Sequence, residues 1–308
     1  MMITRCPVGE LPSSTAVWVN RSSLFGSGPF MRLWETLGGQ PVYWMASEND
    51  RAVAILPGIE FGSGFLTRFQ AMPDGLYAPL LHPQGTPDDA SVLSAKILAG
   101  LVQYGYAKLY LNDYFGQFAD PARLAIRKGA TLVVDIRSVD WEPPDKKLRS
   151  EIRKAEREGV RVEVFSLNRH YDQFLALMCY TEKRHGRKPK YPDGFYRELG
   201  KLSMTDSRVK WLVCEHEGKL AASHIYLTES NVVLNWQVFF DKQFSFLKAN
   251  QLITFTVGRE IARQGLSMLN LGATPADAST LDDYKRKWGG YRYEYNCLEH
   301  KKWWSRWL

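Results

Sequence analysis

The chain has 308 residues, of which 45% are hydrophobic and 24% are charged, with a formal net charge of +7 and a pI near 9.1. These values lie near globular averages and exclude long disorder, while the basic balance permits an anionic partner such as RNA, a phosphorylated substrate or a lipid surface. No run reaches the roughly 20 apolar residues that cross a bilayer, and the start has no apolar signal-peptide core, so we expect a cytoplasmic protein that can work at the inner face of the membrane.

A β-hairpin is the first predicted element, over 42–54, and the same pattern returns over 209–221. Each copy has a β-rich run, a polar turn and a second run rich in Ala, Val and Leu, which is typical of a hairpin. We align the copies by their tryptophans, Trp44 with Trp211.

A helix followed by a short buried strand comes next, over 101–112, and it too has a copy, over 261–272. Both helices end at a glycine suited to a left-handed C-terminal cap, Gly105 and Gly265. Two matched pairs in the same order indicate a duplicated domain, because the repeat is far too long for a solenoid unit.

The boundary between the copies is expected after residue 140, near two prolines that continue neither a helix nor a central strand. We therefore predict domains over 1–140 and 141–308. A helix should open the second domain, with Asp145 as its N-cap, an apolar stripe and Gly159 beyond its end. Arginines at 149, 153 and 157 share one face of it, which either binds phosphates or is a solvated face neutralised by neighbouring glutamates.

Two basic segments are candidates for contact with anions. The loop 183–191 lies between two predicted helices, and its Arg184, Arg187 and Lys188 suit the phosphates of RNA or of a pyrophosphate-bearing acceptor, unless it is a plain surface loop. The C-terminal tail 300–308 alternates cations with aromatics, which suits peripheral membrane contact, nucleic-acid stacking or packing on its own domain.

Motifs of nucleophilic and metal catalysis are missing from the sequence, which has no GxSxG, HExxH, Walker A or GxGxxG after a strand. The four cysteines and six histidines show no metal spacing, so we expect neither a disulfide framework nor a metal site. Among the histidines, His224 is singled out because it falls on a predicted strand.

The order of segments in the second half resembles the Fem-type aminoacyl transferases of the GNAT acyltransferase superfamily. The segments are 148–160, 181–186, the hairpin, Asn270-Leu-Gly272 and Tyr284-Lys-Arg-Lys-Trp-Gly-Gly290; the first half adds 20–29, Leu56-Pro57 and 75–81. This resemblance covers nearly the whole chain. It implies an α+β (mixed α/β) fold of two tandem GNAT-like domains, the second of which binds the donor and is catalytic.

The resemblance also implies an enzyme: an N-acyltransferase in which an amine attacks an activated acyl carbon, with no covalent enzyme intermediate. Its co-substrate would be aminoacyl-tRNA or acyl-CoA with no tightly bound cofactor, and its acceptor an amine of a cell-envelope (peptidoglycan) or specialised-metabolite precursor, small or lipid-linked. Two alternatives stay open, a GNAT N-acetyltransferase using acetyl-CoA and a non-catalytic member that binds a precursor or RNA.

The resemblance assigns a role to Lys285, unless it only caps a basic surface helix end, whereas Asn235 and Gln237 are chosen because buried amides in an apolar strand need partners, which either a ligand or neighbouring strands supply. Lys285, in the aromatic-Lys pair Tyr284-Lys285, is expected to contact a phosphate and stabilise negative charge, with Trp288 packing over the acceptor. The acyl donor should lie beside the strand 233–239, at Asn235 and Gln237, and beside the helix start at Lys248 and Asn250. The stretch 246–252 has no glycine where an ordinary GNAT enzyme has its pyrophosphate turn, so the sequence leaves the two donors open.

Overall fold

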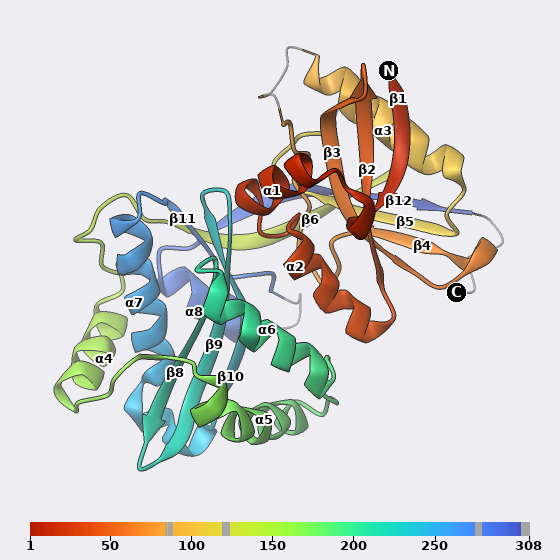
Figure 1. Cartoon of the computed structure of the whole chain (residues 1–308). Coiled ribbons are helices and arrows are strands. Elements are labelled where there is room, and N and C mark those ends of the chain that lie inside the picture. The colour runs from red at the N-terminus through yellow and green to blue at the C-terminus, as the bar shows by residue number, and fades with distance from the viewer. Residues whose placement is uncertain (84, 86–88, 119–123, 275–278, 303–308) are drawn as a thin grey trace. The chain divides into compact units, whose positions relative to one another are not determined.

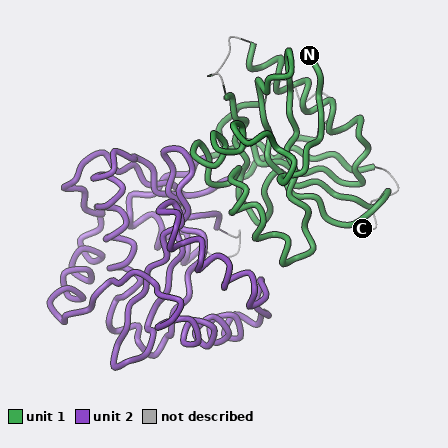
Figure 2. The backbone as a smooth tube through the Cα atoms, viewed as in Figure 1, with its two compact units in different colours: residues 1–129, 294–308 green, residues 130–293 purple. Residues whose placement is uncertain are grey.

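The protein divides into two units, residues 1–129 with 294–308 and residues 130–293, coloured green and purple in Figure 2. In this computed structural model the described residues are 1–83, 85, 89–118, 124–274 and 279–302. The helices and strands of both units are shown in Figure 1. Helices and strands alternate in each unit, which confirms the predicted mixed α/β fold.

The sheet of unit 1 has the strand order β1-β2-β3-β4-β5-β12, antiparallel except for the parallel pair β4 and β5. Its strands are β1 (Met2–Pro7), β2 (Gln40–Glu48), β3 (Arg51–Phe61), β4 (Arg68–Ala71), β5 (Lys108–Asp113) and β12 (Tyr291–Lys301). Its helices are α1 (Ser13–Ser22), α2 (Gly28–Met31), α3 (Ala90–Tyr104) and the 3₁₀ helices η1 (Val8–Glu10), η2 (Arg32–Leu37) and η3 (Gly64–Leu66).

The sheet of unit 2 has the order β6-β11-β10-β9-β8-β7, with β10 and β11 as its parallel pair. Its strands are β6 (Ala125–Asp135), β7 (Glu163–Val164), β8 (Val209–His216), β9 (Lys219–Glu229), β10 (Val232–Phe240) and β11 (Met268–Asn270). Its helices are α4 (Lys146–Arg157), α5 (Leu167–Arg184), α6 (Asp193–Thr205), η4 (Lys242–Leu247), α7 (Ala249–Arg263) and α8 (Ser279–Lys287).

Both predicted hairpins form, β2 with β3 and β8 with β9. Each closes with two residues of positive φ, Asn49-Asp50 and Glu217-Gly218, and each has a register shift, at Ala46/Ser47 and at Cys214/Glu215. The turns and the register shifts fall at matching positions when Tyr43, not Trp44, is aligned with Trp211.

The two faces of the hairpins agree with that alignment and correct the pairing of Trp44 with Trp211. Trp44 packs against Tyr104 of α3, whereas Trp211 packs against Phe174 of α5, on the face opposite α4 and α7. A shift of one residue exchanges the faces of a strand, so the two tryptophans lie on opposite faces of equivalent strands.

The helix that opens the second copy forms as predicted, from Lys146 to Arg157. The Asp145 carboxylate accepts a hydrogen bond from the backbone N–H of Leu148 (2.7 Å), and Gly159 has φ +74° beyond the end of the helix. Leu148, Ile152 and Ala155 are buried in a core shared with α7.

The predicted boundary between residues 140 and 141 is not where the units divide. Unit 2 already begins at residue 130 and ends at residue 293. β6 precedes the prolines of the linker, yet its residues Val133–Asp135 pair with β11 of unit 2, and β12 at the end of the chain pairs with β5 of unit 1. Each unit therefore completes its sheet with a strand that lies elsewhere in the sequence. No helix among the described residues is long and apolar enough to cross a membrane.

Candidate active site

A pocket of about 460 Å³ lies in unit 2, beside the part of β10 that is no longer paired with β11. β11 pairs with β10 only at Val232–Leu234, and beyond that β10 runs on to Phe240 paired with β9 alone. The polar residues that line the pocket are His224, Asn235, Asn250, Gln251, Thr254, Tyr284 and Lys285. The apolar ones are Trp236, Val238, Phe240, Leu271, Leu281 and Trp288.

A β-bulge decides which side chains of β10 face this pocket. The register shifts between Asn235 and Gln237, so that Asn235 and Trp236 both line the pocket. After the bulge the alternation resumes, and Phe239 points to the other face, where it packs against Phe174. Gln237 is absent from the pocket lining. The bulge thus separates the two amides that the sequence analysis places together.

The Asn235 side chain has an unsatisfied acceptor. Its Oδ1 is buried and has no hydrogen-bond partner among the described residues. Buried polar atoms are normally paired, and a missing partner at a pocket wall is a place for a ligand donor. Asn235 therefore brings to the pocket lining an acceptor that no described residue satisfies.

Lys285 lies on the last turn of α8 and is buried. Its Nζ donates to the carbonyls of Gly272 (2.9 Å) and Ala273 (2.8 Å), in the turn after β11. The buried Asn270 shapes this turn, because its Oδ1 accepts from the Gly272 N–H (2.8 Å). Burial lowers the pKa of Lys285 to about 8. An ammonium has three N–H donors, so one remains for the pocket.

Tyr284 and Trp288 flank Lys285 on the same helix end. Trp288 is fully buried, stacks on Trp141 (ring centroids 6.2 Å apart, 15° between planes) and meets the Tyr284 ring edge-on. Burial raises the pKa of the Tyr284 phenol to about 12, so it stays protonated at neutral pH. Trp288 is thus a core residue whose outer edge forms a wall of the pocket.

His224 belongs to a chain of buried polar groups at the pocket floor. Its Nε2 lies 2.9 Å from Asn250 Oδ1 and its Nδ1 lies 3.1 Å from the Tyr226 hydroxyl, which in turn contacts Thr254 Oγ1 (3.2 Å). Burial lowers the pKa of His224 to about 4. The ring is therefore neutral, and because Asn250 presents its carbonyl oxygen, the proton is on Nε2.

The other predicted contact residues lie outside the pocket or at its rim. Lys248 pairs with Glu151 of α4 (3.1 Å), which accounts for its absence from the lining. Arg184 lies over the Phe240 ring (4.1 Å to its centroid), next to the pocket. Arg187 pairs with Glu182 (3.0 Å), and Lys188 is exposed in the loop between α5 and α6.

The basic face of α4 forms a second hollow, of about 490 Å³, lined by Lys146, Arg149, Ser150, Arg153 and Arg157. Arg149 donates to the carbonyls of Pro143 and Pro144, and both Arg149 and Arg153 pair with Glu142, which precedes the helix. Its arginines therefore fix the linker as well as carry charge.

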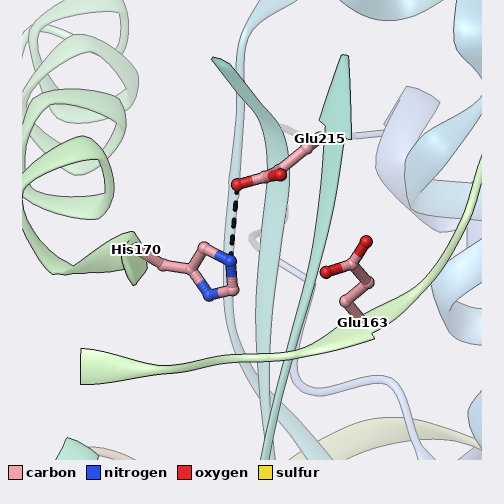
Figure 3. Close-up of side chains that lie close together, drawn as sticks. All are labelled: Glu163, His170 and Glu215. Atoms are coloured by element: carbon pink, nitrogen blue, oxygen red, sulfur yellow. Dashed lines mark ion pairs between the residues drawn. The ribbon is translucent and has the colours of Figure 1, made fainter. Parts of the chain in front are cut away.

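Glu163, His170 and Glu215 form the group of side chains in Figure 3, with one candidate ligand atom from each within 4.8 Å of the others. The backbone N–H of Ser166 donates to His170 Nδ1 (2.9 Å), so in the neutral ring the proton is on Nε2, 3.4 Å from Glu215. That nitrogen has no lone pair for a metal, and Arg169 pairs with both glutamates. The geometry is that of an ion-pair cluster.

Comparisons with known proteins agree with this architecture. Residues 145–286 match the acetyltransferase (GNAT) domain family, and no curated protein matches the chain in sequence. FemX is similar in structure (TM-score 0.71, 10% identity, covering 96% of this chain and 97% of that one). So is the C-terminal domain of a putative lysylphosphatidylglycerol synthetase from Agrobacterium fabrum (TM-score 0.62, 15% identity, 95% and 92%). L-PGS from Bacillus licheniformis follows (TM-score 0.60, 14% identity, 94% and 92%).

The chain therefore has a Fem-like fold of two tandem GNAT-like domains, and residues 145–286 in its second unit match the acetyltransferase (GNAT) domain family. Sequence reasoning found Asn235, Asn250, Tyr284, Lys285 and Trp288 in the lining. It missed Trp236 and Leu281 because the bulge and the start of α8 set their directions, and neither leaves a compositional signal.

Proposed function

We propose that the pocket of unit 2 binds an activated acyl donor and that an amine acceptor attacks its acyl carbon directly. The observation that carries the proposal is the unpaired half of β10, with the free Asn235 oxygen and the Lys285 ammonium at the same pocket. The acyltransferase domain match over this region supports it.

The free edge of β10 suits a donor with an amide-bearing arm. Past Leu234 that side of the strand has no neighbouring strand among the described residues, so its backbone groups can pair with an extended chain. The start of α7 contributes Asn250 and Gln251 to the lining, and a helix N-terminus favours a phosphate. These features favour acyl-CoA as the co-substrate.

Catalysis would rest on charge stabilisation and positioning. When the amine attacks, negative charge develops on the acyl oxygen, and the third N–H of Lys285 can donate to it. The amine nitrogen becomes bonded to the acyl carbon, the bond to the carrier breaks, and the amine proton leaves with the carrier or to solvent. Holding both reactants in one pocket supplies the rest of the rate.

The acceptor is proposed to be an amine of a cell-envelope or specialised-metabolite precursor, small or lipid-linked. The shared fold with FemX and with a lysylphosphatidylglycerol synthetase supports this class. Arg184 at the rim, with Arg187 and Lys188 on the adjoining loop, suits acceptor phosphates. The tail whose membrane contact the sequence suggests lies mostly in 303–308, outside the described residues.

The test is an acyl-transfer assay with a matched pair of variants. The protein is offered acyl-CoA thioesters or charged tRNA with a panel of amines, and thiol release or loss of labelled amino acid from tRNA is followed. Asn235→Ala should lower kcat/KM about tenfold or more through loss of one buried hydrogen bond, whereas Gln237→Ala, on the opposite face of the same strand, should leave it near normal. Turnover of charged tRNA alone would favour the aminoacyl donor. Tight ligand binding without turnover of any donor would indicate a non-catalytic binding protein and overturn the proposal.

A further inference from the structure

The described wall of the pocket combines apolar side chains with one lysine and has no carboxylate. Six of its lining side chains are apolar, three of them the aromatic residues Trp236, Phe240 and Trp288. Its polar groups are amides, hydroxyls, one neutral imidazole and the Lys285 ammonium. No carboxylate is among the described lining residues.

Two carboxylates close to the described lining, those of Glu151 and Asp282, are already paired. Glu151 lies 3.1 Å from the Lys248 ammonium, and Asp282 on α8 lies 2.6 Å from Arg286. The environment also disfavours positive charge on the lysine itself: burial lowers the pKa of Lys285 although two carbonyls accept from its ammonium. Among the described lining residues a second cation would find no carboxylate, and it would face the Lys285 ammonium.

We infer that the acyl group transferred here is uncharged and apolar and larger than acetyl, and that an acyl group with a free ammonium, such as an aminoacyl group, is rejected. The inference rests on the proposed function and names the donor class of that site. An apolar chain would cover the aromatic wall and gain from each buried methylene, whereas an aminoacyl group would bury an unpaired charge.

Two isosteric thioesters separate these cases. Butyryl and β-alanyl thioesters of the same carrier differ only in a terminal methyl or ammonium group. We expect kcat/KM for butyryl to exceed that for β-alanyl by about 100-fold or more, and that for acetyl by about tenfold. Comparable or better use of β-alanyl, or a preference for acetyl, would overturn the inference.

Binding gives a readout that does not depend on turnover. The tryptophans of the wall report occupancy by fluorescence, so Kd can be measured for both thioesters even if the protein transfers neither. Tighter binding of butyryl without transfer would contradict the proposed function, but it would uphold the preference of the pocket for an uncharged acyl group. Equal or tighter binding of β-alanyl would sink the inference itself.

A carboxylate introduced into the pocket wall tests the inference, and the same charge introduced outside the pocket is the control. Leu281 lines the pocket one turn before Lys285 and is 39% exposed, so Leu281→Glu should fold, and should shift the butyryl to β-alanyl ratio at least tenfold towards β-alanyl. Val164→Glu adds the same charge on β7 at a side chain that is 73% exposed and outside the pocket, and should leave the ratio unchanged. An equal shift in both variants would show that net charge, rather than the wall, sets the preference.

Discussion

Lys285 both stabilises the fold and lines the pocket. Its ammonium closes the turn after β11 through the carbonyls of Gly272 and Ala273, and it also lines the pocket. Two of its donors stabilise the fold and the third is free for a developing oxyanion. Replacing Lys285 should therefore change both turnover and thermal stability, which can be measured separately.

Lys285→Ala should lower turnover by about 100-fold or more, the scale of losing one oxyanion-stabilising group. It should also lower the thermal midpoint, because two buried carbonyls lose their donor. Lys287→Ala, two residues along the same helix, is the control and should keep near-normal activity. If Lys287→Ala abolishes activity while Lys285→Ala does not, the site has been assigned two residues from its true position.

His170 should make the stability of unit 2 depend on pH. Burial lowers the pKa of its imidazole from the ordinary 6.5, against the opposing effect of Glu215, while Arg169 lowers it further and Glu163 raises it. Between the folded and the ordinary pKa the unfolded chain binds more protons, so this contribution is present above about pH 6.5 and is lost as pH falls. Protonation would also set an N–H on Nδ1 against the N–H of Ser166.

His170→Asn tests this account, because its amide can still accept from Ser166 but cannot titrate. Urea unfolding at pH 7.5 and pH 5 should show a smaller loss of stability on acidification in the variant than in the wild type. The same loss in both would mean that other groups carry the pH dependence.

At the scale of elements, the sequence predicts those helix ends that are determined by a few neighbouring residues. Asp145 caps α4 and Gly105 and Gly265 end α3 and α7 with positive φ, each for reasons contained in a few neighbouring residues. The bulge in β10 has no such signature, since one extra residue changes neither composition nor length noticeably. It nevertheless decides which of Asn235 and Gln237 reaches the pocket.

Gly258 inside α7 provides an element-scale prediction. Alanine is the better helix former, yet a Cβ at this position would lie 2.5 Å from a ring carbon of Trp141, which stacks on Trp288 behind the pocket. Gly258→Ala should destabilise unit 2 by about 1–3 kcal/mol through overpacking. Urea unfolding measures the change, and near-UV circular dichroism should show a disturbed tryptophan pair. A gain in stability with an unchanged spectrum would show that the stack moves freely.

At the scale of the whole chain, the duplication raises the question of why one copy should hold the site. In unit 1 the strand equivalent to β10 is β4, and all four of its residues pair with β5. In unit 2, β10 has nine residues and only three of them pair with β11. The extra length leaves a free edge beside the pocket in unit 2, and β4 has no such extension.

The most direct measurement of this account is the location of a bound donor. A photoreactive analogue of a butyryl thioester, with a diazirine on the acyl chain, is bound to the full chain, irradiated, and the labelled peptides are identified by mass spectrometry. We predict labels on β10 between Asn235 and Phe240 and on α8, with butyryl thioester competing them away. Labels confined to residues 1–129, or spread evenly over both units and insensitive to competition, would contradict the assignment of the site to unit 2.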